Sequence, residues 1–404
     1  MPWHSCGRSP EKDGGGVQLK PGYKQTEVGV IPEEWDVSSL NDCCSKITDG
    51  THDTPKPVQS GIPYITAIHV KDNCIDFQSC LYVTKADHDI IFSRCNPRQG
   101  DVLLVNIGAG VATTAIIDVD YEFSLKNVAL LKPNRRRIAG EYLNYCLADR
   151  KPKITQALSS GGAQPFLSLT QIGEIIIPLP PPEEQLAVAG ALSDVDALIG
   201  ALDKLIAKKR DIKQAAMQQL LTGKLRLPGF SGKWEVKPLG EIAPLQRGFD
   251  LPTSQLQPGN YPVVYSNGVL NRHSIYMAKG PGVVTGRSGT IGKVNYVEED
   301  YWPHNTTLWV TSFRGNFPKF VYFLYTHIGL ERFGTGSGVP TLNRNDVHAH
   351  RVALPPTTEE QTAIATVLSD MDAEIAEIEK RRDKTRAVKQ GMMQELLTGK
   401  TRLV

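Results

Sequence analysis

Cysteine is confined to the first part of this 404-residue chain, which excludes a disulfide framework shared by the whole molecule. The count is odd, and no two cysteines are spaced as a Cys-x-x-Cys pair. Such a pattern is typical of reduced structural thiols and argues against a zinc site. The seven cysteines are Cys6, Cys43, Cys44, Cys74, Cys80, Cys95 and Cys146.

The chain also has little net charge and shows neither a membrane-spanning nor an export segment. Its formal net charge is +2, which neither requires nor excludes a nucleic-acid partner, because binding can depend on a local basic face. No apolar run of bilayer length is evident, and residues 1–20 lack the apolar centre of a signal peptide. We therefore expect a cytoplasmic protein with no membrane contact and a disordered leader at residues 1–20.

Catalytic motifs are missing as well. The sequence has no Asn-Pro-Pro-Tyr or Asp-Pro-Pro-Tyr tetrapeptide of amino-methyltransferases, and no HExxH or GxSxG. Residues 286–293 resemble a phosphate loop, but the spacing is one residue too long and Val294 stands where Ser or Thr would ligate magnesium. His348 and His350 form a lone His-x-His, which we interpret as a surface turn. No catalytic residue, metal or cofactor is expected in this chain.

What the sequence does contain is one long phrase that occurs twice. Glu184 and Glu360, 176 residues apart, each belong to a Glu-Glu-Gln triplet, and the same offset holds to the end of both copies. The matched segments are 183–185, 192–196 and 218–227 with 359–361, 368–372 and 394–403; Trp35-Asp36-Val37 and Leu40 with Trp234-Glu235-Val236 and Leu239; Pro165 and Leu167 with Pro340 and Leu342; and 19–23 with 227–230. The repeat predicts a pseudo-two-fold symmetric molecule whose chain ends lie near each other.

Both copies of the phrase predict a helix of about 40 residues, roughly 60 Å long. Prolines and acids mark the first turn, Thr358 and Gln361 have capping-box spacing, and Gly223 and Gly399 stand where glycine ends a helix. A 3-4 spacing, the seam of a coiled coil, runs through each copy and turns polar past its middle. The seam is Val188, Leu192, Val195, Ile199, Leu202, Ile206, Lys209, Lys213, Ala216 and Leu220, and Ile364, Leu368, Met371, Ile375, Ile378, Arg382, Thr385, Lys389, Met392 and Leu396.

Such helices could pair in either of two ways. They could pair with another chain as a dimerisation coiled coil, or with each other, antiparallel, within one chain. We favour the second, because a compact segment separates two seams on one chain. The mid-seam charges would weaken packing but fix register and orientation.

Each helix follows a segment of short apolar runs between polar or glycine-rich turns, here called head 1 (35–180) and head 2 (234–354). Strand candidates outnumber helix candidates, so each head is expected to be a mixed α/β domain built around a sheet. The predicted strands are 102–105, 128–131, 175–177, 263–265, 283–284, 308–310 and 352–354, and the predicted short helices are 141–147 and 319–327.

The sequence resembles the DNA-sequence specificity subunits of type I restriction–modification systems along nearly its whole length. The features that carry the resemblance are the paired Pro-Pro…Glu-Glu-Gln helices ending in Leu-Leu-Thr-Gly-Lys, the Asp49-Gly50-Thr51-His52 turn and the phrase 338–343. The lead-in 20–26 and 31–35 is also typical. One departure is in head 1, where Ala163-Gln164-Pro165-Phe166-Leu167 replaces Gly-Val-Pro-Thr-Leu.

The resemblance implies an α+β fold of two target recognition domains joined by two long antiparallel helices that form a coiled-coil spacer. It implies a non-catalytic subunit that recognises an asymmetric, bipartite site in double-stranded DNA. Two methylation subunits, carrying S-adenosylmethionine, would dock on it, and motor–nuclease restriction subunits would join them. The implied organisation is a leader at 1–20, target recognition domain 1 at 21–180, spacer helix 1 at 181–227, target recognition domain 2 at 228–354 and spacer helix 2 at 355–404.

Side-chain chemistry indicates the candidate DNA-binding residues, because Arg suits guanine, and Asn and Gln suit adenine. For each, a solvated loop or a turn-stabilising role is the alternative. Residues 135–137, three arginines, fit a phosphate-facing or merely solvated patch rather than base readers. The candidates are Thr51, His52, Lys56, Lys71, Asn106, Lys126 and Asn127 in head 1, and Gln246, Arg247, Asn267, Arg272, Arg287, Asn305 and Thr306 in head 2.

Two other classes of function compete with this interpretation. A self-sufficient DNA methyltransferase would need a methyl-donor pocket and would methylate without a partner. A coiled-coil scaffold would bind no nucleic acid, and the basic and amide-rich turns of both heads argue against it.

Overall fold

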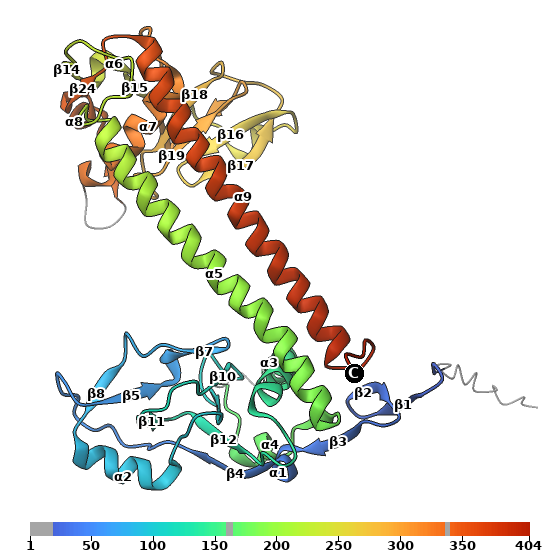
Figure 1. Ribbon diagram of the computed structural model, residues 1–404. Helices are drawn as coiled ribbons and strands as arrows, with labels where there is room; N and C mark the ends of the chain where they lie inside the picture. The colour runs from blue at the N-terminus through green and yellow to red at the C-terminus, as the bar shows by residue number, and fades with distance from the viewer. Residues whose placement is uncertain (1–18, 159–164, 336–339) are drawn as a thin grey trace, which may run out of the picture. The chain divides into compact units, whose positions relative to one another are not determined.

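The protein folds into two compact units, seen in a computed structural model that describes residues 19–158, 165–335 and 340–404 (Figure 1). Unit 1 contains the chain up to Gly200 together with Asp383–Val404, and unit 2 contains Ala201–Arg382. The predicted leader up to residue 18, Ala163-Gln164 and Gly338-Val339 lie outside the described residues.

Unit 1 is built around a four-stranded sheet of order β10-β9-β12-β4 and a three-stranded sheet of order β11-β5-β8, in which β5 and β11 are parallel. A third pairing, β3 with β13, ties the entry of the unit to its exit. Its elements are β1 (Tyr23–Thr26), β2 (Gly29–Pro32), β3 (Asp36–Ser39), α1 (Leu40–Cys43), β4 (Cys44–Asp49), β5 (Ile62–Thr66), η1 (Ala67–His69), β6 (Val70–Lys71), β7 (Cys74–Ile75), β8 (Leu81–Val83), α2 (Lys85–Cys95), β9 (Val102–Leu104), β10 (Thr114–Ile116), β11 (Ser124–Lys126), β12 (Ala129–Pro133), α3 (Gly140–Leu158), α4 (Leu169–Gly173), β13 (Ile176–Leu179) and the start of α5 (Pro182–Leu220).

Unit 2 repeats this topology. Its sheets have the orders β15-β21-β18-β19 and β17-β16-β20, with β16 and β20 parallel, and β14 pairs with β24. Its elements are the rest of α5, β14 (Glu235–Pro238), α6 (Leu239–Ile242), β15 (Leu245–Arg247), η3 (Thr253–Gln255), β16 (Tyr261–Tyr265), β17 (Gly268–His273), β18 (Gly282–Gly286), β19 (Val294–Val297), β20 (Trp302–Pro303), β21 (Thr307–Val310), α7 (Pro318–Ile328), η4 (Leu330–Phe333), β22 (Gly334–Thr335), β23 (Thr341–Leu342), α8 (Arg344–Ala349), β24 (Arg351–Leu354) and most of α9 (Thr358–Leu396).

The predicted elements are confirmed. Each predicted strand coincides with a strand, the predicted helix 319–327 lies in α7, and the predicted helix 141–147 is the first part of the longer α3. The sheet orders correspond strand by strand between the units, which confirms a repeated α+β fold. The core of each unit is apolar and continuous with the long helices: Val188, Leu192 and Leu396 lie in the core of unit 1, and Ile364 and Leu368 in that of unit 2.

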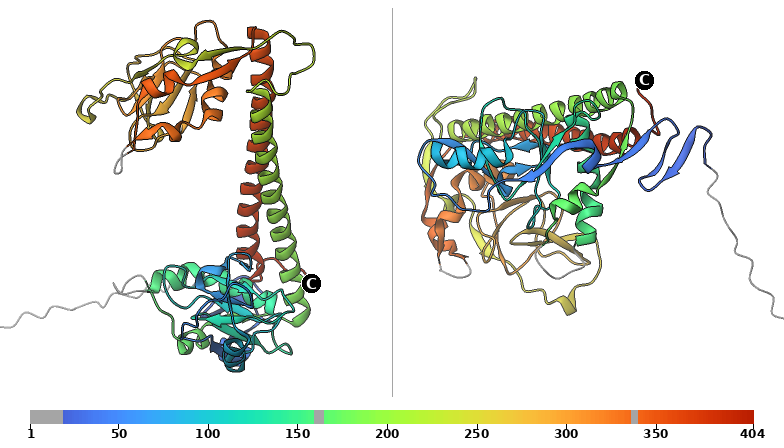
Figure 2. Two further views of the ribbon diagram at one scale, coloured as in Figure 1. Left: turned by 90° about the vertical axis from the view of Figure 1, so that its left-hand side faces the viewer. Right: turned by 90° about the horizontal axis from the view of Figure 1, so that it is seen from below.

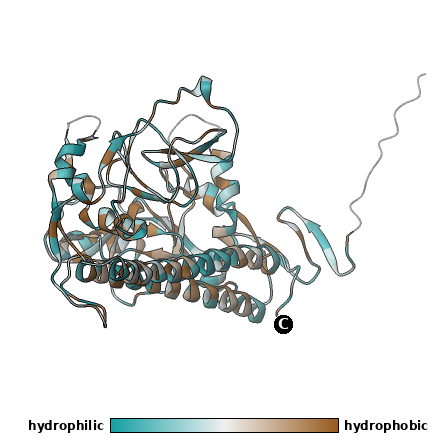
Figure 3. Ribbon diagram, turned by 90° about the horizontal axis from the view of Figure 1, so that it is seen from above, coloured by the Kyte–Doolittle hydropathy of each residue, from teal (hydrophilic) through white to brown (hydrophobic). Residues whose placement is uncertain are grey.

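The two long helices run antiparallel within each unit, as predicted for pairing inside one chain (Figures 1 and 2). Each of the predicted seam residues is buried or half-buried. Apolar and polar residues are interspersed along both long helices, as the hydropathy colouring shows (Figure 3).

Ion pairs across the polar part of the seam fix its register. In unit 2, Lys213 pairs with Asp372 and Arg382 with Asp203. The segment from Asp203 to Lys213 in α5 thus lies opposite the segment from Arg382 back to Asp372 in α9, as an antiparallel register requires. In unit 1, Lys389 lies 2.6 Å from Asp196, which also accepts hydrogen bonds from Tyr145 Oη (2.8 Å) and Asn73 Nδ2 (2.9 Å). The mid-seam charges therefore have partners, as the expected role in register requires.

A buried carboxylate stands at the start of each long helix. Glu184 is 0% exposed, and its oxygens accept bonds from Trp35 Nε1 (2.8 Å) and from Arg402 Nε and Nη2 (2.5 and 2.8 Å). Since Arg402 follows the end of α9, the cluster ties the start of one helix to the end of the other. The bonds to Glu184 also raise the pKa of Arg402.

Unit 2 contains the same cluster with the helices exchanged. Glu360 is 1% exposed and accepts bonds from Trp234 Nε1 (3.3 Å) and Arg226 Nη2 (2.7 Å), and Arg226 follows the end of α5. We call these sets the Trp–Glu–Arg clusters. The tryptophan in each packs over the glycine that ends a helix, since a Cβ on Gly223 would lie 3.1 Å from the ring of Trp234.

Among the described residues, the N-terminal lead-in and the C-terminal segment contact each other in unit 1, in agreement with the prediction that they lie close together. Tyr23 Oη donates to the carbonyl of Gly399 (2.9 Å), and Arg402 Nη1 lies 2.9 Å from Glu34 Oε1. This contact holds the pKa of the Glu34 carboxyl below its ordinary value. Gly223 and Gly399 both adopt positive φ, +72° and +66°, which confirms their predicted role as helix-ending glycines.

The predicted capping box of Thr358 and Gln361 is wrong. The hydroxyl of Thr357 accepts from the backbone N–H of Glu360 (3.3 Å), whereas Gln361 is 3% exposed and its Oε1 accepts from Phe317 N (2.8 Å). In unit 1, Gln185 Oε1 accepts from Ala139 N in the same way (2.9 Å). The glutamine of each Glu-Glu-Gln triplet therefore docks the segment before α3 or α7 instead of capping its own helix.

The structure also bears on two expectations, that no segment could span a membrane and that the cysteines are reduced. α5 is long and apolar enough to cross a membrane by length and composition, so the sequence-based exclusion of such a run was too strict. Its residues Val188, Leu192, Leu202 and Ile206 are buried in the fold.

The six described cysteines are free. Cys74 is exposed and the others are buried. Burial raises the pKa of the Cys44 thiol to about 12.

Removing one partner of a Trp–Glu–Arg cluster should be costly. We expect Arg226→Ala to lower the free energy of unfolding by about 3–5 kcal/mol, because it leaves the buried Glu360 carboxylate without its countercharge. The double variant Arg226→Ala/Glu360→Gln should recover much of that loss. Urea unfolding followed by circular dichroism measures both.

The matched control is Arg210→Ala, which removes a more exposed pair with Glu379. It should cost less than about 1 kcal/mol. Equal losses for Arg226→Ala and Arg210→Ala would contradict the structural role given to the cluster.

Candidate nucleic-acid interface

In unit 2, three loops meet at one end of the four-stranded sheet. The turn 247–250 follows β15, Arg287 follows β18, and residues 304–306 precede β21. Backbone bonds join them: Gly248 N donates to Thr307 O (3.0 Å) and Arg287 N to Thr306 O (2.8 Å). Ser266 N, from the turn between β16 and β17, donates to Thr306 Oγ1 (3.3 Å). We call this loop set surface 2.

Unit 1 has the equivalent loops, here called surface 1. Gly50 N donates to Val128 O (3.2 Å), and Asn127 N donates to Thr51 O (3.2 Å). The turn glycine is required in both units, because a Cβ on Gly50 would lie 2.2 Å from Leu125 O and one on Gly248 would lie 2.2 Å from His304 O. The Asp49-Gly50-Thr51-His52 turn therefore corresponds to Arg247-Gly248-Phe249-Asp250.

The Pro-x-Leu segments also correspond. Leu167 N donates to Asn106 O (2.8 Å) as Leu342 N donates to Arg287 O (2.7 Å), and Gly108 N donates to Pro165 O (2.9 Å) as Gly289 N donates to Pro340 O (3.1 Å). The match of these segments in the sequence is therefore structural, despite the departure in head 1. Asn106 and Arg287 occupy the same place in their units.

Most of the residues predicted in head 2 come together. Arg247, Arg287, Asn305 and Thr306 lie in surface 2, with Gln246 and Asn267 next to them along the chain. Arg272 lies elsewhere: it is at the far end of the β16–β17 hairpin, opposite Pro262, and its Nη2 lies 2.8 Å from Glu299.

The residues predicted in head 1 divide similarly. Thr51, His52, Lys126 and Asn127 lie in surface 1, and Lys126 donates to Thr54. Thr51 and Asn106 are 8% and 5% exposed, so their place favours a supporting role. The remaining two lie outside the bonds that join surface 1: Lys56 is on the exposed chain after the turn, and Lys71 is in the β6–β7 hairpin.

Two acidic residues that were not among the candidates organise these turns. Asp250 Oδ1 accepts from Arg247 Nη2 (2.9 Å) and from Asn305 Nδ2. Asp49 lies at the equivalent turn of surface 1, 3.0 Å from His52 Nε2 and 2.7 Å from Arg94 Nη2. The signal in the sequence was an acidic residue paired with a histidine or arginine three residues away across each turn glycine.

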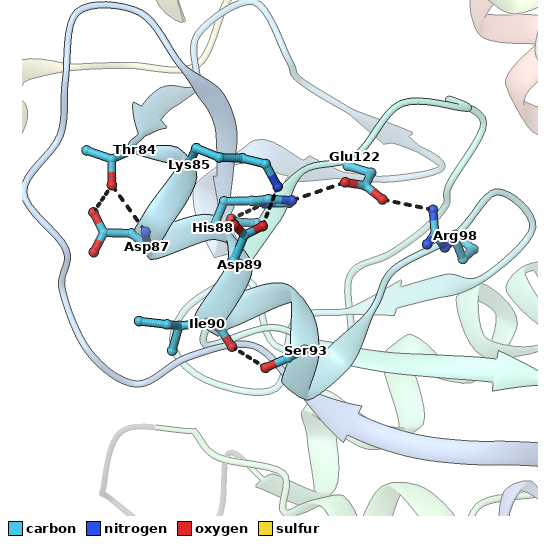
Figure 4. Close-up of polar contacts among 10 residues, drawn as sticks. Thr84, Lys85, Asp87, His88, Asp89, Ile90, Ser93, Arg98 and Glu122 are labelled. Carbon is cyan, nitrogen blue, oxygen red and sulfur yellow. Dashed lines mark hydrogen bonds and ion pairs between the residues drawn. The ribbon is translucent and has the colours of Figure 1, made fainter.

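A buried histidine positions β11, which carries Lys126. His88 is 0% exposed, and its Nδ1 lies 3.0 Å from Ser124 Oγ. Its Nε2 lies 3.3 Å from Glu122, which also contacts Arg98 (Figure 4). Thr84 caps the same helix, α2, by accepting from Asp87 N (3.1 Å) (Figure 4). Because Ser124 begins β11, this network holds the strand that ends at Lys126.

Two histidines of unit 2 have similar structural roles. His304 stacks on Tyr265 with ring centroids 4.3 Å apart, and burial lowers its pKa. His348 Nε2 accepts from Leu245 N (2.7 Å), and burial lowers its pKa too. The His-x-His motif is thus partly buried rather than a solvated turn. Among the described residues, no cluster of three His, Cys, Asp or Glu side chains could hold a metal ion.

Comparison with known proteins agrees with this architecture. The model of the type I restriction modification DNA specificity domain matches the chain twice, at residues 32–209 and 231–386. The specificity subunit of a candidate type I restriction enzyme, MjaX, of Methanocaldococcus jannaschii is 28% identical, covering 94% of this chain and 97% of that protein. The MjaVIII specificity subunit of the same organism is 25% identical over 54% of this chain and 52% of its own length.

Two solved structures share the fold. A type I restriction–modification S subunit from M. genitalium has a TM-score of 0.62 at 15% identity, covering 94% of this chain and 99% of that one. A chain from a study of complex assembly and conformational transition of the type I R-M system has a TM-score of 0.54 at 16% identity, covering 92% and 99%.

The chain belongs to the type I restriction modification DNA specificity family. It is a DNA-recognition subunit, which confirms the function predicted from the sequence. The relatives are named specificity subunits, in agreement with a non-catalytic role.

Surface 2 depends on the close approach of its turn to the backbone of residues 303–304. We expect Gly248→Ala to lower the free energy of unfolding by about 1–3 kcal/mol and to weaken DNA binding, because the added methyl group would overlap His304 O. Thermal unfolding and fluorescence anisotropy measure the two effects. The control is Gly200→Ala in α5, where a Cβ meets nothing within 4 Å. It should raise stability by up to about 1 kcal/mol. Unchanged stability in Gly248→Ala would contradict the close approach.

Proposed function

We propose that this chain recognises an asymmetric DNA site in two parts, one through surface 1 and the other through surface 2. The observation that carries the proposal is that equivalent loops sit on equivalent strands in both units but differ in their side chains. Asn106 replaces Arg287, and Asp49 with His52 replaces Arg247 with Asp250. Because the backbone arrangement of the loops is the same but their side chains differ, the two half-sites should differ in sequence.

The residues proposed to reach the DNA are those on the two surfaces other than the buried Thr51, with Arg287 foremost. The side chain follows a strand end between Gly286 and Gly289, where the backbone can approach DNA closely. A guanidinium suits the O6 and N7 acceptors of guanine in the major groove. Thr51, Asn106 and Arg272 would act through the fold rather than by touching bases.

We further propose that this cytoplasmic chain acts only with partner subunits. Two methylation subunits, each binding S-adenosylmethionine, would dock on it, and motor–nuclease subunits would complete the complex. Support comes from the missing methyltransferase tetrapeptide and from the relative whose structure was solved in a study of complex assembly. Methylation of the site by the isolated chain would contradict this. The domain limits 21–180 and 228–354, with spacer helices 181–227 and 355–404, remain part of the proposal.

Arg287→Ala should relax one position of one half-site. Loss of a bidentate contact to guanine should cost about 1–3 kcal/mol of discrimination at that position, while the half-site of unit 1 stays unchanged. Competition binding against single-base variants of the target, with methylation subunits present, measures it.

The same experiment separates base contact from phosphate contact. If Arg287 touched only phosphate, affinity would fall for all sequences alike and the salt dependence would flatten. Arg272→Ala is the control, because Arg272 lies outside surface 2 and pairs with Glu299. Loss of discrimination in both half-sites together would contradict separate recognition.

A further inference from the structure

The two surfaces carry similar three-residue networks in which the acidic residue stands on opposite sides of the turn glycine. In surface 2 an arginine precedes the turn glycine, an aspartate follows it, and an asparagine completes the set: Arg247, Asp250 and Asn305. In surface 1 the order is acid first: Asp49, His52 and Asn127. Because Gly50 and Gly248 are equivalent, so are the side-chain pairs beside them, Asp49 with His52 and Arg247 with Asp250.

The two networks differ in whether an exposed side chain keeps hydrogen-bond donors that are not already used within the network. His52 has partners on both ring nitrogens, Asp49 Oδ2 at 3.0 Å and Asn127 Oδ1 at 2.9 Å. Arg247 has five N–H donors, and Asp250 takes one of them, at Nη2. The side chain of Arg247 is 51% exposed, so the guanidinium is accessible at the surface.

Asp250 is placed to hold this arginine in one orientation. A single oxygen, Oδ1, accepts from both Arg247 and Asn305, so the carboxylate joins two candidate base readers from β15 and from the loop before β21. A guanidinium fixed by a carboxylate loses less rotamer entropy when it meets a base, and its planar fork matches guanine O6 and N7.

We infer that Asp250 is a positioning residue that orients Arg247 to read a guanine in the half-site contacted by unit 2. The inference rests on the proposed function. In unit 1 the residue equivalent to Arg247 is Asp49, and the arginine that contacts Asp49, Arg94, comes from α2 rather than from the turn.

The sign of the charge makes the inference testable. Asp250 is 64% exposed and anionic groups repel DNA phosphates, so Asp250→Ala should leave the affinity for random duplex equal or higher. It should at the same time lower discrimination at one base pair, by about five- to 150-fold. A residue with a merely structural role would lower binding to all sequences alike.

The experiment measures competition binding of the complete complex against all single-base variants of its target. Arg247→Ala and Asp250→Ala should relax the same base pair, and the double variant should relax it no further than Arg247→Ala alone. Asp250→Asn, which keeps an acceptor oxygen, should recover part of the discrimination. Glu299→Ala is the matched control, because it removes an exposed carboxylate–arginine pair of the same unit outside surface 2.

The outcomes distinguish the positioning role of Asp250 from the proposed two-part recognition of DNA. If Asp250→Ala matches Glu299→Ala, or relaxes a different base pair from Arg247→Ala, the positioning role is wrong while two-part recognition stands. If the unaltered complex shows no base discrimination in the unit 2 half-site, the proposed function itself fails. Should the alanine variant fold poorly, Asp250→Asn still tests the inference, because it should relax the same base pair as Arg247→Ala by a smaller factor.

Discussion

A carboxylate buried at the start of a helix is the constraint on which the rest of this molecule depends. Glu184 and Glu360 are almost inaccessible to water, and an ionised carboxylate in such a place is tolerable only when it is fully bonded. The bonds come from a tryptophan at the entry of the unit and an arginine beyond the end of the opposite helix. One carboxylate per unit thus joins the head, the start of one helix and the end of the other. This explains why the repeated phrase begins with Glu-Glu-Gln and ends near Gly-Lys-x-Arg.

The same constraint leaves the loops at the sheet ends free to vary. Turn glycines and backbone bonds preserve the frame of surfaces 1 and 2, since Gly50 and Gly248 both lie against backbone oxygens. The side chains on that frame are under no such requirement. A recognition subunit needs this division, because a new base preference must not disturb the helices that hold the two units.

Periodic and locally encoded features were predictable from the sequence. The seam, the helix-ending glycines, the strands and the match between Pro165 and Pro340 were all confirmed, because each depends on spacing or on a residue's own conformational preference. What depends on tertiary partners was not predictable. Gln361 has capping spacing but bonds to Phe317, and Arg272 has the chemistry of a base reader but pairs with Glu299. Asp250 was missed because its importance lies in two bonds, one of them to a residue 55 positions away.

We propose that the two long helices set the gap between the two half-sites, independently of the bases that each unit reads. The most direct test inserts seven residues into both helices at matched places, after Asp203 in α5 and before Arg382 in α9, so that the antiparallel register is kept. Two added turns lengthen each helix by about 10.5 Å, close to the rise of about three base pairs. Mapping of methylated adenines, with methylation subunits present, should show both half-sites unchanged and the gap about three base pairs longer. Altered half-site bases with an unchanged gap would contradict the account.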